Sequence, residues 1–214
     1  MKKEDITIKG IKKLFEDKKY KFFTGKNYDL NVIGFRLARS ISDSFDDYLI
    51  IIYKDLGGKD HIEIFPCTTD PGKHWLLNPL NVRGTAIVVP NQYPKSHKIG
   101  IHGRSSPTGG YKALEQVGNM LYVRDNNKDN ILDFSLMNDK KNIFSGNIKT
   151  NIHRASKWKT LLNVQRYSAG CTVVQKPSDF DRVLELVETQ EQSGYGNHIT
   201  YTLITEEEYN KANY

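Results

Sequence analysis

Short apolar runs separated by turn residues constrain the fold of this chain more than any other feature. The run DYLIIIYKD, the Gly57-Gly58 pair and the run HIEIFPC have the lengths and the turn of a β-hairpin. GTAIVVP, HKIGIHG and HITYTLI are further strand-length runs. Several short strands with turns between them predict a β-rich domain rather than a helical bundle.

Two segments have the periodicity of an amphipathic helix. Within residues 4–20, apolar side chains recur at helical spacing among lysines and acids, and residues 177–194 repeat this arrangement after Ser178, a suitable N-cap. We therefore expect an α+β, β-rich domain with a few peripheral helices. A weak boundary near residue 25 would divide a helical extension, 1–25, from the main domain, 26–214.

The composition is that of a globular protein, with 38% hydrophobic and 26% charged residues among 214. No apolar run approaches the roughly 18 residues of a membrane span, so we expect no membrane insertion. The basic N-terminal segment lacks the apolar core of a signal peptide. We therefore expect synthesis in the cytoplasm, and any action outside it would need another route.

Lysine and arginine outnumber aspartate and glutamate by 31 to 25, which gives a net charge of +6. Such a charge suits a polyanionic partner, including nucleic acid, cell-wall polymer or an anionic membrane. The lysines are spread along the chain, and no nucleic-acid-binding motif accompanies them, so nucleic acid is not an expected partner. Phosphate-binding and dinucleotide-binding loops are also missing, so we predict no cofactor.

The two cysteines, Cys67 and Cys171, are too few for a disulfide framework. Cys171 ends a Ser-Ala-Gly-Cys turn ahead of an apolar run, and His153 lies at the end of an earlier predicted strand. A cysteine nucleophile needs a neighbouring base, and small residues before it let a carbonyl approach backbone N–H groups. On residue types alone, the alternative is a core cysteine with an unrelated surface histidine.

The order of these residues resembles the active-site motif of the L,D-transpeptidases, the YkuD-like fold. The likeness is sharp over residues 151–174 and extends loosely over 84–190. It implies a β-sandwich or barrel domain that attacks peptidoglycan stem peptides through a cysteine. It also implies that Cys171 is the nucleophile and His153 the base.

The same resemblance implies roles for the neighbours of this pair. The backbone carbonyl of Arg154 would orient the histidine, and the region of Gly170 would help to form the oxyanion hole. Ser168 matches the small hydroxyl residue of the motif and is a candidate substrate contact. The motif departs from the family at Ala169, where a histidine is usual, and just after the cysteine, where Thr172 or Val173 stands in place of the usual polar or arginine residue.

These departures leave three functions open. TTDPG, GTAI, IGIHG and YVRDNNKDN are similar to uncharacterised proteins of bacteriophages and their hosts, which favours cutting peptidoglycan over crosslinking it. The leading expectation is a cysteine-dependent stem-peptide hydrolase, an L,D-carboxypeptidase or endopeptidase such as a phage lysin, acting at the cell wall. The alternatives are an L,D-transpeptidase proper and a non-catalytic virion or structural domain that kept the fold.

Three further residues are candidate substrate contacts. His102 ends a strand that enters a Gly-rich loop, where it would bind substrate or replace the missing motif histidine. Arg104, in the same loop, could hold a stem-peptide carboxylate with two parallel hydrogen bonds. Tyr167, next to the Ser-Ala-Gly-Cys turn, could line a groove for peptide or glycan.

Metal binding has weak support. His97 and His102 match no strong zinc spacing, and their separation puts them on opposite sides of a strand. The segment Asp125 to Asp133 has oxygen-bearing residues at several calcium-loop positions, but it lacks the usual glycine and the bidentate glutamate. We predict no metal site and expect this segment to be a solvated hairpin turn.

Overall fold

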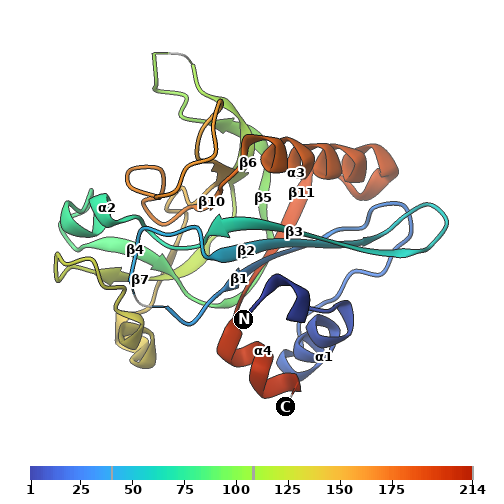
Figure 1. The fold of residues 1–214 in the computed structure, drawn as a ribbon, viewed down its shortest axis with the longest axis horizontal. Coiled ribbons are helices and arrows are strands. Elements are labelled where there is room, and N and C mark those ends of the chain that lie inside the picture. Colours follow the sequence, from blue (N-terminus) through green and yellow to red (C-terminus); the bar gives the residue numbers. More distant parts are fainter. Residues whose placement is uncertain (40, 108, 214) are drawn as a thin grey trace.

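A barrel of eight strands forms the body of the protein in a computed structural model that describes residues 1–39, 41–107 and 109–213 (Figure 1). Its strands neighbour one another in the order β1-β11-β5-β6-β9-β10-β3-β2. The β1–β11 and β9–β10 pairs are parallel, and the others are antiparallel. The strands are β1 (Asn31–Arg36), β2 (Asp47–Lys54), β3 (Asp60–Thr68), β5 (Asn91–His102), β6 (Tyr111–Gln116), β9 (Ile152–Arg154), β10 (Thr172–Val174) and β11 (His198–Thr205).

A smaller sheet and a few helices complete the fold, which confirms the expectation of a β-rich α+β domain. The second sheet has the order β4 (Thr85–Val88), β7 (Met120–Asp125) and β8 (Phe144–Gly146). The α-helices are α1 (Ile8–Lys18), α2 (Lys73–Leu77), α3 (Pro177–Gln190) and α4 (Glu206–Asn213). Short 3-10 turns lie at Lys3–Asp5, Phe134–Asn138 and Lys140–Asn142, and a π-helical turn spans Glu191–Tyr195.

The unbroken apolar run of β2 is buried on both faces of the sheet. Leu49 and Ile51 belong to the core cluster inside the barrel, whereas Ile50 and Ile52 belong to the cluster that contacts α1 and α4. Successive side chains of a strand point to opposite faces, so a strand covered on both sides needs apolar residues throughout. This double burial explains why the run does not alternate with polar residues.

Helices α1 and α4 lie together at one end of the molecule, where both chain termini are found (Figure 1). Thr7 caps α1 by accepting a hydrogen bond from the Gly10 N–H at 3.0 Å. Ile11, Leu14 and Phe15 are buried in the same cluster as strand residues of the barrel. The segment predicted as a helical extension therefore contributes to a shared core.

Helix α3 packs its apolar stripe against the barrel interior, where Phe180, Val183 and Val187 join the main core cluster. The helix begins at Pro177, with Lys176 as its N-cap, so the prediction of Ser178 as the cap is wrong. Proline is favoured at the first helical position because its φ is already helical and its missing N–H would be unpaired there.

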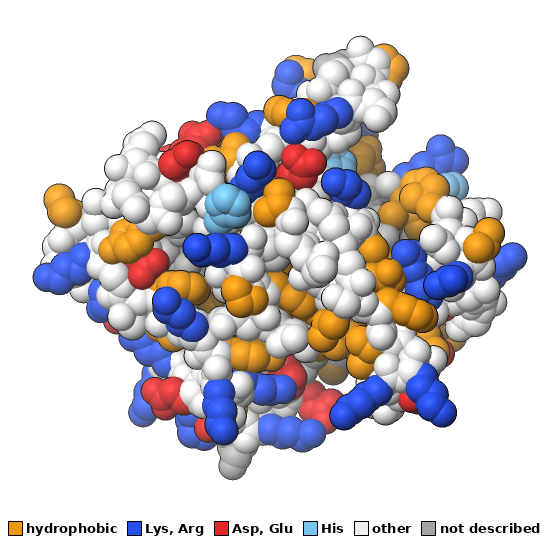
Figure 2. All heavy atoms as spheres, turned by 180° about the vertical axis from the view of Figure 1, so that it is seen from behind, with side chains coloured by type: hydrophobic (Ala, Val, Ile, Leu, Met, Phe, Trp, Pro, Cys, Tyr) orange, Lys and Arg blue, Asp and Glu red, His pale blue; other side chains and the backbone are white. Residues whose placement is uncertain are grey.

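The surface carries its positive charge diffusely. Figure 2 shows lysine and arginine side chains scattered over one face, among acidic and neutral ones. Among the helices that the structure describes, none is both long and apolar enough to cross a membrane.

Phe15→Ala should lower the free energy of unfolding by about 3–5 kcal/mol, because it removes a large side chain from a closed core. Urea denaturation of the whole chain measures this change. Lys9→Ala on the exposed side of the same helix is the control and should change stability by less than about 0.5 kcal/mol. A loss below about 1 kcal/mol for Phe15→Ala would show that α1 contributes little to the core.

Candidate active site

The pairing of β9 with β10 brings His153 and Cys171 to one face of the barrel wall. His153 is the register partner of Val173, and the Thr172 N–H donates to the Asn151 carbonyl at 3.1 Å. Partners across a parallel pair share a face, and so do residues two apart on one strand. Cys171, which immediately precedes β10, is buried in one cluster with Val173 and Ala155, so it lies on the same side of the wall as His153.

Hydrogen bonding determines the tautomer of His153. Its Nδ1 lies 2.9 Å from the Arg154 carbonyl oxygen, which can only accept a hydrogen bond, and 3.0 Å from the Tyr111 hydroxyl. A proton on Nδ1 satisfies both contacts, because the hydroxyl oxygen can accept from it as well, and we assign the proton to this nitrogen. The Tyr111 hydroxyl donates to the same carbonyl at 3.0 Å. Nε2 is consequently the nitrogen with the free lone pair, and it is buried with no hydrogen-bond partner. This is the atom from which a general base would act.

His102 stacks on His153, with ring centroids 3.9 Å apart and an interplanar angle of 15°. The side-chain oxygen Oδ1 of Asn151 accepts a hydrogen bond from the Gln116 backbone N–H at 2.9 Å, which fixes the side-chain amide and turns its NH₂ group toward His102. That NH₂ group donates to Nδ1 of His102 at 3.0 Å, so the proton of His102 is on Nε2. The structure thus brings His102, one of the predicted site residues, onto the ring of His153.

Burial keeps the two residues of the pair neutral. It lowers the pKa of His153 to about 3, with a further contribution from His102. It raises the pKa of the Cys171 thiol to about 11, against the opposing effect of hydrogen bonds from the backbone of Asn151 and Ala169. The thiol lies 3.6 Å from the Lys149 carbonyl and is not hydrogen-bonded to His153. In the resting state, the thiol and the imidazole are therefore both neutral and do not form an ion pair.

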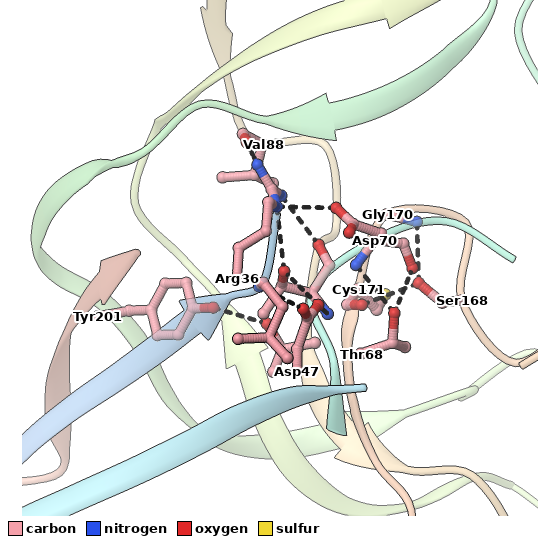
Figure 3. A network of polar contacts seen from close by, with 12 residues as sticks. Arg36, Asp47, Thr68, Asp70, Val88, Ser168, Gly170, Cys171 and Tyr201 are labelled. Carbon is pink, nitrogen blue, oxygen red and sulfur yellow. Dashed lines mark hydrogen bonds and ion pairs between the residues drawn. The ribbon is translucent and has the colours of Figure 1, made fainter. Parts of the chain in front are cut away.

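The turn before Cys171 is held by its own side chains (Figure 3). The Ser168 hydroxyl donates to the Cys171 carbonyl at 2.8 Å and accepts from the Gly170 N–H at 3.2 Å. Gly170 has a φ of +119°, and a Cβ there would lie 2.7 Å from the Ala86 carbonyl oxygen, so only glycine fits. Ser168, predicted to contact substrate, is fully buried in this turn, and the Gly170 N–H is already paired.

Tyr111 is a member of the site that sequence reasoning missed. It is the register partner of His102 across the β5–β6 hairpin. The Arg154 guanidinium lies 4.2 Å from the centroid of its ring. Burial raises the pKa of Tyr111, and the nearby Cys171 thiol and Tyr167 raise it further. In the sequence, the only indication of this role is that Tyr111 follows two glycines at the far end of the loop that His102 begins.

The remaining predicted contacts lie at the margin of this site. Tyr167 is 44% exposed and immediately precedes the Ser168 turn. Arg104 lies beyond the end of β5, with 64% of its side chain exposed, and forms an ion pair with Glu115 at 3.3 Å. The guanidinium of Arg104, which was expected to bind substrate, is thus paired with the carboxylate of Glu115.

A buried polar network stands beside the turn (Figure 3). Arg36 Nε lies 2.9 Å from an Asp70 carboxylate oxygen, and another of its nitrogens donates to the Val88 carbonyl. Asp47 accepts hydrogen bonds of 2.8 Å from the backbone N–H groups of Leu37 and Thr69. Burial and the nearby Asp70 raise the pKa of Asp47. This network ties β1 to the end of β3, the strand on which β10 pairs.

No group of three or more histidine, cysteine, aspartate or glutamate side chains is placed to hold a metal ion in residues 1–39, 41–107 and 109–213. His97 hydrogen-bonds the Thr150 carbonyl, whereas His102 contacts His153, so the two histidines of the zinc hypothesis have separate surroundings. In the calcium-like segment, the Asp125 carboxylate accepts backbone N–H groups of Asn127 and Asp133. Its carboxylate oxygens are thus engaged in holding the loop.

Comparison with protein-family models, curated proteins and solved structures finds no match to this chain. Function is therefore inferred from the geometry of the site.

Acidification should destabilise the fold partly through His153. An unfolded histidine titrates near 6.5, whereas His153 in the folded chain has a pKa of about 3. Its contribution is fully present above pH 6.5 and is lost as the pH falls toward the folded value. His153→Gln should therefore lose less stability than the wild type between about pH 7 and about pH 4.5, by at least about 1 kcal/mol.

Urea denaturation at a series of pH values measures this difference. Asp47 has the opposite sign, because a raised carboxyl pKa favours the folded state at low pH and loses that effect as the pH rises. Its contribution is common to both proteins and cancels in the comparison. Parallel stability curves for the two proteins would contradict the assignment of His153 as a buried neutral group.

Proposed function

We propose that this chain is a cysteine-dependent hydrolase of peptidoglycan stem peptides with an L,D-transpeptidase-like fold. The observation that carries the proposal is the free Nε2 of His153, on the same face as Cys171 and with its opposite nitrogen bound to a carbonyl. A general base needs such a lone pair near the proton that it removes. A buried histidine with only a structural role would be expected to have both nitrogens paired, as His97 does.

In the proposed first half-reaction, Nε2 of His153 takes the proton of Cys171 as the sulfur attacks a stem-peptide carbonyl. The C–S bond forms, and the carbonyl oxygen becomes an oxyanion held by the N–H of Cys171. The C–N bond then breaks, and His153 returns its proton to the leaving amine. Because thiol and imidazole are both neutral at rest, proton transfer accompanies attack and does not precede it.

In the second half-reaction, water attacks the thioester while His153 accepts one of its protons. The C–S bond breaks, the new carboxylic acid leaves, and the proton passes from His153 to the sulfur. An amine in place of water would give a transpeptidase from the same site. The substrate, in the terms of the resemblance, is a stem peptide of the cell wall, and enzyme made in the cytoplasm would reach it at lysis or in a virion.

The stacked His102 compensates for the departure at Ala169. The motif histidine is missing from the turn, but β5 supplies an imidazole from another part of the chain, in contact with His153. His102 contributes to the low pKa of His153, so the stacked ring favours the neutral form from which a base acts. The pair therefore retains a second histidine despite the sequence of the turn.

A non-catalytic domain that kept the fold is the second candidate function. The burial of Cys171, which is only 8% exposed, and its raised pKa favour this alternative. Catalysis and a structural role predict different behaviour of the thiol, and two experiments separate them.

Cys171→Ala should reduce the release of peptides from purified sacculi by about three orders of magnitude or more, since the nucleophile is lost. Mass spectrometry of the soluble digest measures this release. Cys67→Ala is the matched control, because Cys67 faces the barrel core and should leave the chemistry intact. Unchanged digestion by Cys171→Ala would refute a thioester mechanism.

Alkylation by iodoacetamide should be slow at neutral pH and should accelerate as the pH approaches the pKa of Cys171, about 11. Cys171 should still react faster than Cys67, which is fully buried and has its pKa raised further by the surrounding aspartates. Peptide mapping of the alkylated protein gives both rates. Equal rates for the two cysteines would favour the structural alternative.

A further inference from the structure

One stretch of the chain, which includes both His153 and Cys171, carries no acidic residue. Residues 140–178 contain eight lysines and arginines and no aspartate or glutamate. Outside this stretch, acidic residues outnumber basic ones by 25 to 23, so the stretch accounts for the positive net charge of the chain. Within the described residues, none of these eight cations forms an ion pair with a carboxylate. They are therefore available to an anionic partner.

The loop between β9 and β10, residues 155–171, displays two large apolar side chains in the same stretch. Trp158 is 82% exposed, and Leu162 is 84% exposed. Lys157 and Lys159 flank the tryptophan and are exposed as well. The ammonium group of Lys157 lies 4.5 Å from the centroid of the Trp158 ring. The β9–β10 loop thus presents apolar and cationic side chains together.

Contacts with the rest of the fold anchor this loop. Val164 is fully buried, and its N–H donates to the Asp43 carbonyl at 3.2 Å. Leu161 packs against the buried cluster beneath the loop. The Arg166 carbonyl accepts a hydrogen bond from the Trp75 indole N–H at 3.0 Å, which attaches the loop to α2 (Figure 1). Since the residues around them are held inward, the two exposed apolar side chains belong to a fixed surface.

This combination of side chains fits the surface of an anionic lipid bilayer. Tryptophan is favoured at the boundary between lipid and water, and an exposed leucine gains free energy when it leaves water for the acyl layer. Lysines at that boundary are attracted to the phosphates of anionic lipids. A soluble polyanion would pair with the cations but offers no apolar layer to Leu162. A neutral glycan could stack on Trp158 but would leave the cations unpaired.

We propose that the β9–β10 loop binds the surface of an anionic lipid bilayer. Trp158 and Leu162 enter the boundary layer, while Lys157 and Lys159 contact lipid phosphates. This contact is peripheral, and it requires no segment that crosses the bilayer. The inference goes beyond the proposed hydrolase and does not rest on its chemistry. Because the same loop ends at Cys171, binding would hold the candidate active site close to the membrane surface.

Sedimentation of the whole chain with vesicles measures this binding. Vesicles of phosphatidylglycerol should bind it at least about tenfold more tightly than vesicles of phosphatidylcholine, which carry no net charge. The double variant Lys157→Gln/Lys159→Gln should bind phosphatidylglycerol about thirtyfold more weakly than the wild type, because it loses two contacts with phosphates. Lys3→Gln/Lys9→Gln removes the same charge near α1, across the molecule from the loop, and should bind like the wild type (Figure 1).

A second pair of variants tests the apolar part of the contact. Leu162→Ser should weaken binding to phosphatidylglycerol vesicles about tenfold, because the side chain no longer gains by leaving water. Leu56→Ser is the matched control, since Leu56 is 76% exposed in the turn between β2 and β3, far from the loop (Figure 1). It should leave binding unchanged.

Tryptophan fluorescence locates the contact, because Trp75 and Trp158 are the only tryptophans of the chain. Phosphatidylglycerol brominated in its acyl chains should quench the emission of the wild type. In Trp158→Phe, which keeps an aromatic ring at the loop, this quenching should be lost. Quenching that persists in Trp158→Phe would place the contact elsewhere.

Three results of the vesicle experiments would overturn the inference. The first is equal binding to both kinds of vesicle, or binding to neither. The second is an equal loss for the two lysine double variants, since binding would then follow net charge and not this loop. The third is retention on immobilised heparin without binding to vesicles, which would identify a soluble polyanion as the partner. The substituted side chains are exposed or partly exposed, so circular dichroism of each variant should match that of the wild type.

Discussion

The parallel pairing of β9 with β10 is the constraint on which the site depends. Each strand has only three residues, and their register fixes His153 beside Val173. A shift of one residue would turn His153 to the opposite face and separate it from Cys171. The register is supported by Val173 pairing with Thr68 on β3 and by the turn that Ser168 closes. The hydrogen bonds of Ser168 within the turn therefore help to fix the position of the Cys171 sulfur.

Burial favours the neutral resting state of this site and raises the free energy needed to form charges in it. Two charges in a buried pair cost several kcal/mol of desolvation each, and a neutral thiol beside a neutral imidazole avoids that cost. In the proposed reaction, deprotonation of Cys171 would coincide with formation of the C–S bond, when backbone N–H groups can stabilise the oxyanion. A substrate of that reaction would have to bring its carbonyl to the sulfur before any charge appears. A site of this kind is slow toward general thiol reagents and selective for a carbonyl that it can position.

The main features of the fold could be predicted from local patterns, and the surroundings of the site could not. Strand-length runs indicated a β-rich domain, and the apolar stripe of residues 177–194 indicated α3. His153 and Cys171 could be identified because both lie in one short stretch of sequence, residues 151–174. Tyr111 reaches His153 because β6 pairs with β9, a segment distant in the sequence, and no motif marks it. Arg104 was expected to bind substrate, but in the structure it forms an ion pair with Glu115 on the next strand, β6.

Ala169 changes meaning once the structure is considered. In the sequence, it is the residue that weakens the likeness to the L,D-transpeptidases, because a motif histidine is lost. In the fold, a second imidazole comes from β5 and stacks on His153, while Ala169 lines a pocket beside the turn. A histidine ring at position 169 would occupy this pocket, whereas the ring of His102 on β5 leaves it free. If the proposed chemistry holds, the ring of His102 would give His153 the aromatic neighbour that the turn before Cys171 does not supply.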